Sequence, residues 1–225
     1  LLALHAPRLG EIERRDNGKL AIEVTPQIRY LADYVHYYAG LADKVQSEVI
    51  PSDKQGVFAY TKHEAKGVVA IITPWNSPLA LTTWKLAPAL AAGCTVVVKP
   101  SEYTSASMVE FAKLFAEAGF PSGVVNVVTG FGQEVGEPLV THPQVAHVGF
   151  TGGEGSGRKI YELAARDFKT VTLELGGKSP NIVFDDADLD QAVKGVIAGI
   201  FAASGQTCIA GSRLLVQAGI HDAFV

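Results

Sequence analysis

Short runs of apolar, β-branched residues alternate with longer amphipathic segments from Gly67 onward. Several of the short runs are apolar on both faces, whereas the longer segments are rich in Ala, Leu and Glu. Strands that alternate with helices in this way form parallel sheets that are covered on both sides. The pattern therefore predicts an α/β fold with a doubly wound parallel sheet. The predicted strands are residues 67–73, 95–100, 124–130, 145–152 and 170–176, and the predicted helices are 79–92, 104–118, a short one after Gly132, and 155–167.

The segments that precede this alternation have different patterns. Residues 25–46 have helical periodicity, and their tyrosines lie mostly on one face, which we interpret as a packing face. Residues 47–66 contain Pro51 and Gly56 and predict an irregular or hairpin arm.

A new pattern begins after Gly176, with the run PNIVF, an acidic cluster and a helix at about 189–203. We therefore expect a domain boundary near residue 177, with one domain over 1–177 and the start of a second over 178–225.

Composition excludes several classes of protein. Hydrophobic residues make up 48% of the chain and charged residues 19%, with a net charge of −4, which is typical of a globular protein. Lys and Arg do not cluster, and no apolar run approaches the roughly 18 residues of a membrane span, so we expect neither nucleic acid nor membrane as a partner. Two cysteines cannot form a disulfide framework, which favours a cytoplasmic location. The sequence begins at Leu1, so the question whether a targeting peptide precedes it stays open.

Chemically useful side chains stand at the carboxyl ends of the predicted strands, where doubly wound folds bind ligands. Asn76 follows one strand in TPWNSPL, Lys99 and Glu102 follow another in KPSE, and Glu174 ends a third in LELGG. Cys208 lies in GQTCIAGSR, near the end of the sequence. A thiol, a carboxylate, an amide and a Lys/Glu pair suit an oxidation that proceeds through a covalent thioester.

Two glycine-rich loops leave alternatives open. The loop GGEGSGRK nearly matches a phosphate-binding P-loop, but Arg158 and Lys159 stand where Lys and Ser/Thr are required. The loop GFGQEVG is similar to a dinucleotide fingerprint without matching it, and tight-turn geometry explains both loops equally well. The acidic run DADLD lacks the Gly and Glu of a calcium loop, so we interpret it as a helix cap and predict no metal site.

Separate motifs resemble, in order and spacing, the NAD(P)-dependent aldehyde dehydrogenase family: TPWNSPL, LAPALAAGCTVVVKPSE, GFTG, LELGGKSPNIVF and GQTCIAGSR. The resemblance implies a Rossmann-like cofactor domain over 1–177 and the beginning of an α/β catalytic domain over 178–225. The implied reaction is oxidation of an aldehyde to a carboxylic acid through a cysteine thiohemiacetal and thioester. A catalytically silent member with an assembly or binding role is the alternative, beside the less favoured P-loop-like module.

The resemblance also assigns roles to catalytic residues. Cys208 would be the nucleophile, and the Asn76 amide together with the Cys208 backbone N–H would stabilise the oxyanion. Glu174 would activate water for thioester hydrolysis. The other cysteine, Cys94 in AAGCTVVV, is expected to lie in the core.

NAD is the cofactor that the resemblance implies, with NADP as a weaker alternative. The carboxylate of Glu102 would accept hydrogen bonds from the adenosine ribose of NAD and repel the 2′-phosphate of NADP. Gly153 stands where the family usually has Ser, so either a backbone N–H contacts the pyrophosphate or binding is looser. The predicted cofactor contacts are Ile72, Thr73, Pro74, Trp75, Lys99, Ser101, Glu102, Gly132, Gly136, Phe150, Gly152, Gly153, Leu175 and Gly176.

The substrate is expected to be a small-molecule aldehyde of unspecified structure. Trp84 matches a tunnel aromatic of the family, whereas Ser77 and Ala202 replace the Phe of many relatives and imply a wider or more polar entrance. Family members are much longer, and this sequence stops shortly after Cys208. We therefore expect the 225 residues alone to be inactive, and the full-length protein to be a homodimer or homotetramer.

Overall fold

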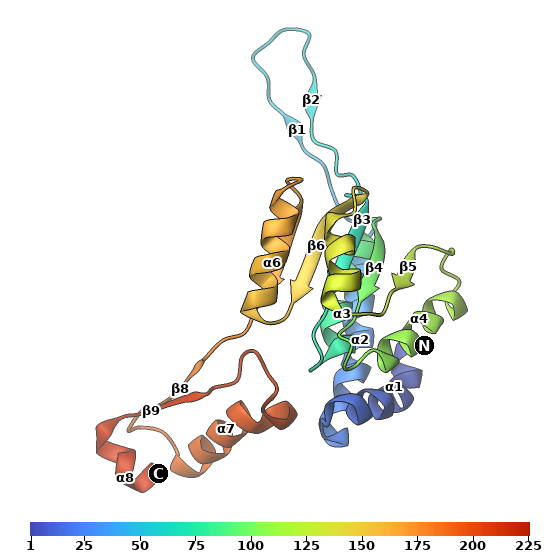
Figure 1. The fold of residues 1–225 in the computed structure, drawn as a ribbon. Coiled ribbons are helices and arrows are strands. Elements are labelled where there is room, and N and C mark those ends of the chain that lie inside the picture. Colours follow the sequence, from blue (N-terminus) through green and yellow to red (C-terminus); the bar gives the residue numbers. More distant parts are fainter.

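The computed structural model describes all 225 residues of the chain. A five-stranded sheet with the strand order β5-β4-β3-β6-β7 forms its centre, and every neighbouring pair of strands is parallel. The predicted doubly wound α/β fold is therefore confirmed (Figure 1). Its strands are β3 (Val68–Ile72), β4 (Thr95–Lys99), β5 (Val125–Val127), β6 (Val145–Thr151) and β7 (Thr170–Glu174).

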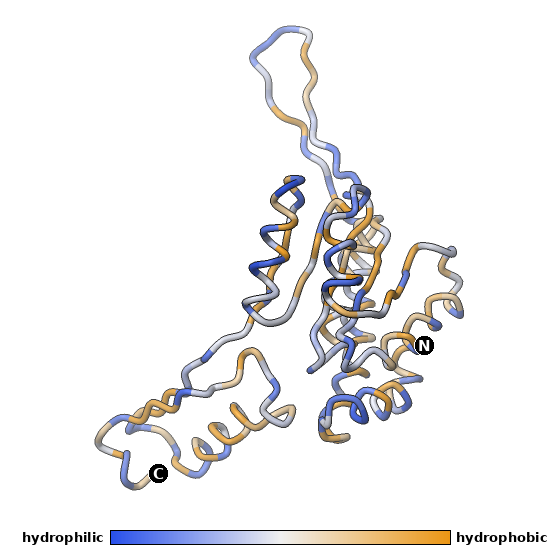
Figure 2. The backbone as a smooth tube through the Cα atoms, in the orientation of Figure 1, coloured by the Kyte–Doolittle hydropathy of each residue, from blue (hydrophilic) through white to orange (hydrophobic).

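Helices cover both faces of this sheet, and the alternation of side chains along β3 divides the core in two. Val69 and Ile71 pack with residues of α3 and α4, whereas Ala70 and Ile72 pack with residues of α5 and α6. Figure 2 shows the central strands as predominantly hydrophobic, as burial on both faces requires. The covering elements are α3 (Pro78–Ala91), α4 (Ala106–Glu117), the π-helical turn η1 (Gly132–Gly136), α5 (Glu137–Thr141) and α6 (Glu154–Ala165).

Two N-terminal helices pack against the α3 and α4 side of the sheet. Helix α1 (Leu2–Asn17), for which the sequence pattern gave no prediction, buries Ala6 and Leu9 in the core. Helix α2 (Ala21–Leu41) begins and ends earlier than the predicted 25–46. Its buried residues are aliphatic, namely Val24, Ile28 and Leu31.

The interpretation of the tyrosines of α2 as a packing face was wrong for two of them. Tyr30 and Tyr37 are 61% and 63% exposed. The spacing of the aromatic rings did not reveal that the neighbouring aliphatic side chains of α2 are the ones that reach the core.

The predicted arm is a hairpin of two short antiparallel strands, β1 (Val49–Ile50) and β2 (Ala59–Tyr60). It projects away from the sheet in Figure 1, and its side chains are mostly exposed.

Residues after Gly177 form a separate parallel sheet of β8 (Pro180–Val183) and β9 (Arg213–Val216). Asp188 accepts a hydrogen bond of 3.0 Å from the Gln191 N–H at the start of α7, so the cap interpretation of the acidic run is confirmed. The remaining elements are α7 (Leu189–Phe201), η2 (Ala202–Gly205), η3 (Ala218–Ile220) and α8 (His221–Phe224).

Candidate active site

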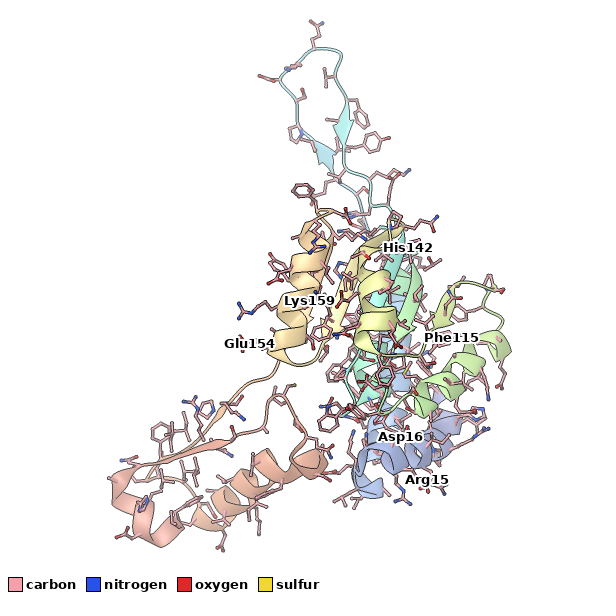
Figure 3. All side chains as sticks on the ribbon, viewed as in Figure 1. Arg15, Asp16, Phe115, His142, Glu154 and Lys159 are labelled. Atoms are coloured by element: carbon pink, nitrogen blue, oxygen red, sulfur yellow. The ribbon has the colours of Figure 1, made fainter.

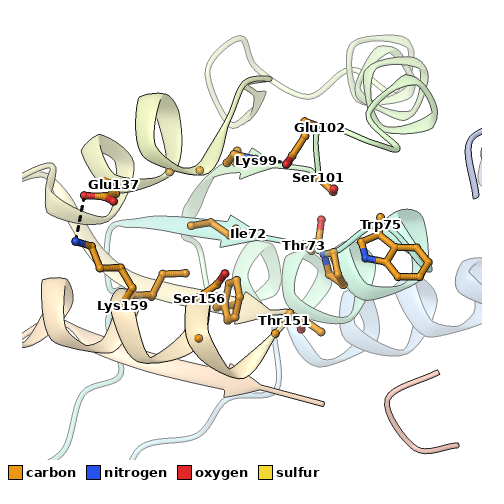
Figure 4. A pocket seen from close by; sticks show the side chains of 18 of the residues that line it. Ile72, Thr73, Trp75, Lys99, Ser101, Glu102, Glu137, Thr151, Ser156 and Lys159 are labelled. Carbon is orange, nitrogen blue, oxygen red and sulfur yellow. Dashed lines mark ion pairs between the residues drawn. The ribbon is translucent and has the colours of Figure 1, made fainter. Parts of the chain in front are cut away.

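A cavity of about 510 Å³ lies at the carboxyl ends of β3, β4 and β6. The chain leaves β3 toward β4 on one side and later returns to pair β6 on its other side, so the cavity lies at the switch point where such sheets bind ligands (Figure 4). Most of the predicted cofactor residues line it. These are Ile72, Thr73, Pro74, Trp75, Lys99, Ser101, Glu102, Gly132, Gly136, Phe150, Gly152 and Gly153.

Glycine shapes the wall of this cavity beside β6. A Cβ on Gly152 would lie 2.5 Å from the ring of Phe150. Any residue other than glycine at position 152 would therefore displace this ring. A Cβ on Gly157 would lie 2.6 Å from Leu175, which packs against the first turns of α6. Leu175 and Gly176 follow β7 and do not line the cavity, although both were predicted as cofactor contacts.

The N-terminus of α6 opens into the same cavity. Gly153 is its N-cap and supplies no side-chain hydrogen bond, so the backbone N–H groups of the first turn remain without a side-chain partner. Gly153, Gly155 and Ser156 all line the cavity. Free N–H groups and the helix dipole favour an anion at this position.

Lys99 and Glu102 stand on the opposite wall, at the end of β4. The Lys99 Nζ donates a 2.8 Å hydrogen bond to the Pro100 carbonyl and lies 3.9 Å from the Glu102 carboxylate. Burial lowers the pKa of Lys99, and the charge of Glu102 opposes that shift. A second ion pair on the cavity wall, between Glu137 and Lys159, was not predicted from the sequence. Its charged groups are 3.7 Å apart, and Figure 4 draws the pair as a dashed line. Lys159 lies on α6 and is labelled in Figure 3.

The two cysteines differ in their surroundings. Cys94 is buried in the core, as expected, whereas Cys208 is exposed in the turn after η2. The backbone N–H of Cys208 has no backbone acceptor, so it is available as a donor. The Asn76 side chain donates a 2.7 Å hydrogen bond to the Gln206 carbonyl, two residues before Cys208. The structure thus brings the predicted amide and the loop of the predicted thiol together.

Iodoacetamide should label Cys208 well before Cys94 near neutral pH. Labelling of Cys94 requires local opening of the core, and an opening free energy of about 1.4 kcal/mol already slows the reaction about tenfold. Mass spectrometry of the peptides from a time course measures both rates. Equal rates for the two thiols would contradict the exposure of Cys208.

Lys85 is a site residue that sequence reasoning missed. Its Nζ donates to the Thr151 hydroxyl at the end of β6, where Thr151 pairs with Glu174 of β7. Burial lowers the pKa of Lys85, and the negative charges of Glu174 and Cys208 oppose that shift. One cation therefore interacts electrostatically with both predicted catalytic groups. The available signal was a single charged residue within the apolar run LALTTWKLAPALAA.

None of the predicted substrate residues lines the 510 Å³ cavity. The Ser77 hydroxyl accepts a 2.9 Å hydrogen bond from the buried Lys19 and is turned toward the α1–α2 connection. Trp84 is 45% exposed, and its carbonyl accepts a 3.1 Å hydrogen bond from Tyr34. Ala202 is exposed at the start of η2.

The sequence model of the aldehyde dehydrogenase family matches residues 1–225, and the chain belongs to this family. The dehydrogenase of Acinetobacter baylyi named for (Z)-2-((N-methylformamido)methylene)-5-hydroxybutyrolactone is 54% identical over 225 residues, which are 100% of this chain and 46% of that protein. The crystal structure of an NAD-dependent aldehyde dehydrogenase from Sinorhizobium meliloti is 44% identical with a TM-score of 0.95, over 99% of this chain and 44% of that one.

A second solved structure is betaine aldehyde dehydrogenase from Staphylococcus aureus in complex with NAD⁺. It is 43% identical with a TM-score of 0.96, over 99% of this chain and 44% of that one. The chain therefore spans less than half the length of the relatives that it matches. None of its helices combines the length and the apolar character needed to span a membrane.

Proposed function

We propose that this chain carries the cofactor domain, over 1–177, and the beginning of the catalytic domain, over 178–225, of an NAD-dependent aldehyde dehydrogenase. The observation that carries the proposal is the arrangement of one cavity and one polar site around the ends of β3, β6 and β7. The cavity suits a dinucleotide. The polar site consists of the Cys208 thiol, the Glu174 carboxylate, the Asn76 amide and the Lys85 ammonium group. The family of the chain and its NAD-dependent neighbours support the same reaction.

The residues of the cavity fit NAD. Its volume of about 510 Å³ falls within the range of about 300–1,000 Å³ for cofactor and small-molecule sites. A Cβ on Gly132, Gly153 or Gly155 would meet nothing within 4 Å, so bare backbone forms these parts of the wall and a phosphate can approach it closely. We propose that the first turn of α6 holds the pyrophosphate and that Lys99 and Glu102 hold the adenosine ribose. When bound, NAD⁺ supplies the hydride acceptor for the oxidation.

The protein's own residues then carry the remaining chemistry. Cys208 attacks the aldehyde carbon as a thiolate and forms a thiohemiacetal, and after oxidation it holds the acyl group as a thioester. One hydrogen of the Asn76 amide is bonded to the Gln206 carbonyl, so the second hydrogen and the free Cys208 N–H are the donors for the oxyanion. Glu174 takes a proton from the water that hydrolyses the thioester. Lys85 balances the negative charges of Glu174 and Cys208.

A panel of aldehydes offered with NAD⁺ tests this function directly, with the protein expressed from its full gene. The absorbance of the reduced cofactor should rise with at least one member of the panel. No reduction of NAD⁺ or NADP⁺ with any aldehyde would contradict the proposed reaction and favour a silent role in assembly or binding.

Glu102→Gln should narrow the preference for NAD over NADP, chiefly by improving the use of NADP. Two anions about 4 Å apart repel by about 1 kcal/mol in water and more when partly buried, so kcat/KM for NADP should rise about fivefold or more. Steady-state kinetics with each cofactor measures the ratio. Glu117→Gln, at the end of α4 outside the cavity, is the matched control and should leave the ratio unchanged. An unchanged ratio in Glu102→Gln would show that Glu102 does not face the ribose.

Gly152→Ala should weaken NAD binding about tenfold, because overpacking of this kind typically costs about 1–3 kcal/mol. The new methyl group would lie 2.5 Å from the Phe150 ring and push it from the cavity wall. Fluorescence or calorimetric titration measures the Kd for NAD. Gly40→Ala makes the same substitution in α2, where a Cβ meets nothing within 4 Å, and should leave the Kd unchanged. Equal affinities of wild type and Gly152→Ala would place NAD away from this wall.

A further inference from the structure

Three residues distant in the sequence form a closed ring of hydrogen bonds beside the polar site. The Asn17 side chain donates to the Asn76 carbonyl at 3.0 Å, and the Asn76 side chain donates to the Gln206 carbonyl at 2.7 Å. The Gln206 side chain donates to the Asn17 carbonyl at 3.0 Å and closes the ring. The side-chain amide of each residue thus donates to the backbone carbonyl of the next, so the ring fixes the relative positions of the end of α1, the loop after β3 and the loop after η2.

The ring determines how the Asn76 amide is oriented. A primary amide has two N–H donors, and the Gln206 carbonyl accepts one of them, so the plane and the second donor have a defined direction. The Asn76 Oδ1 is buried and has no hydrogen-bond partner, so it does not contribute to holding the side chain in place. The orientation of the amide therefore depends on the Gln206 carbonyl that accepts from it, and on the two other hydrogen bonds of the ring, which position Asn76 and Gln206.

A buried ion pair holds the α1–α2 connection against the start of α3. The Lys19 side chain is 2% exposed and the Glu13 side chain 0%, and their charged groups are 3.3 Å apart. Lys19 also donates to Ser77 at 2.9 Å, and Glu13 accepts from the Leu79 N–H at 3.3 Å. Burial raises the pKa of Glu13, and the charge of Lys19 opposes that shift. The pair thus bonds to Ser77 and Leu79, which follow Asn76 by one and three residues.

The same connection also holds the loop that precedes Cys208. Ser204 donates a 3.1 Å hydrogen bond to the Gly18 carbonyl, and the Ala203 N–H donates to Glu23 of α2 at 3.1 Å. Arg15 and Asp16, labelled in Figure 3, lie in the last turn of α1, which ends directly before Gly18.

We propose that Asn17 is a positioning residue for aldehyde oxidation, which holds the Asn76 amide and the Cys208 loop in the relative geometry that the oxyanion requires. This inference rests on the proposed function. Asn17 makes no hydrogen bond to Cys208 or Glu174 and acts on them through Asn76 and Gln206, while its side chain also interacts with the buried Glu13 carboxylate. The α1–α2 connection is therefore part of the active-site architecture, although it lies outside every motif that carries the family resemblance.

Asn17→Asp is the most direct test, in the protein expressed from its full gene. The substitution keeps the size of the side chain and its acceptor for the Lys19 N–H, but it replaces the donor to Asn76 with an oxygen that repels the carbonyl. The rate of the first turnover should fall about tenfold or more, because small displacements of catalytic donors cost factors of this size. The Kd for NAD and the labelling rate of Cys208 should stay within about twofold, whereas general loosening of the structure would change both.

A double-mutant cycle separates positioning from an independent structural effect. In the Asn76→Ala background, Asn17→Asp should cause less than about a twofold further loss, because the side-chain amide that Asn17 orients is absent, although the backbone carbonyl that accepts from Asn17 remains. Losses that multiply in the double variant would overturn the positioning role. A full first-turnover rate in Asn76→Ala alone would instead overturn the oxyanion role of Asn76, and this inference with it.

Asn126→Asp is the matched control, since Asn126 also donates from its side chain to backbone carbonyls but lies on β5, away from the site. It should leave the first turnover unchanged. If Asn17→Asp does not fold, Gln206→Glu breaks the ring at the Asn17 carbonyl and should give the same pattern. Wild-type first-turnover rates in a folded Asn17→Asp or Gln206→Glu would overturn the proposal.

Discussion

Cys208→Ala is expected to lower kcat for aldehyde oxidation by about 10⁴-fold or more, because loss of a nucleophile removes the covalent pathway altogether. The Kd for NAD should stay within about threefold, since Cys208 does not line the cofactor cavity. Steady-state turnover and a titration with NAD measure the two quantities on the same preparation.

Cys94→Ala is the control for this experiment. It removes the other thiol of the chain, which is buried in the core and is not part of the polar site. The turnover per folded molecule should equal that of wild type. Measurable steady-state oxidation by Cys208→Ala, above that of a blank, would contradict a covalent mechanism at Cys208.

Glu174→Gln should separate the two halves of the reaction. Addition of Cys208 to the aldehyde and oxidation of the thiohemiacetal to the thioester do not need the carboxylate, whereas hydrolysis of the thioester needs a base. The variant should therefore release one reduced cofactor per site and then stall. The steady-state rate should fall by about 10²-fold or more, the size of a general-base contribution. Stopped-flow absorbance records the burst and the slow phase that follows.

Glu162→Gln makes the same change on an exposed position of α6 outside the cavity and should keep the full steady-state rate. Full turnover by Glu174→Gln would assign the base to another group and leave Glu174 a structural role.

The sheet and the cavity could be predicted from the sequence because they follow local rules. Period and composition gave the strands of the central sheet within a few residues, and the carboxyl ends of parallel strands meet at one edge. The strand pattern alone placed Lys99 and Glu102 at that edge, whereas Ile72 to Trp75 were assigned as cofactor contacts by the family resemblance. All of these residues line the cavity.

Other features depend on contacts between distant segments, which no local pattern encodes. Helix α1 contains Pro7 and Gly10 and is polar on average, so its sequence gives a weak helical signal, although tertiary packing stabilises it. The role of Asn17 depends on residues at positions 76 and 206, and that of Lys85 on Glu174 and Cys208. Only the folded chain places these groups together.

The central claim is that Cys208 carries the substrate as a thioester, and peptide mass spectrometry of acid-quenched Glu174→Gln tests it most directly. The enzyme is mixed with NAD⁺ and an aldehyde that wild type oxidises, and it is then quenched and digested. We expect the peptide containing Cys208 to gain the mass of the acyl group, in proportion to the burst, while the peptide containing Cys94 stays unmodified. A burst of reduced cofactor without an adduct on the Cys208 peptide would show that Cys208 does not carry the substrate as a thioester.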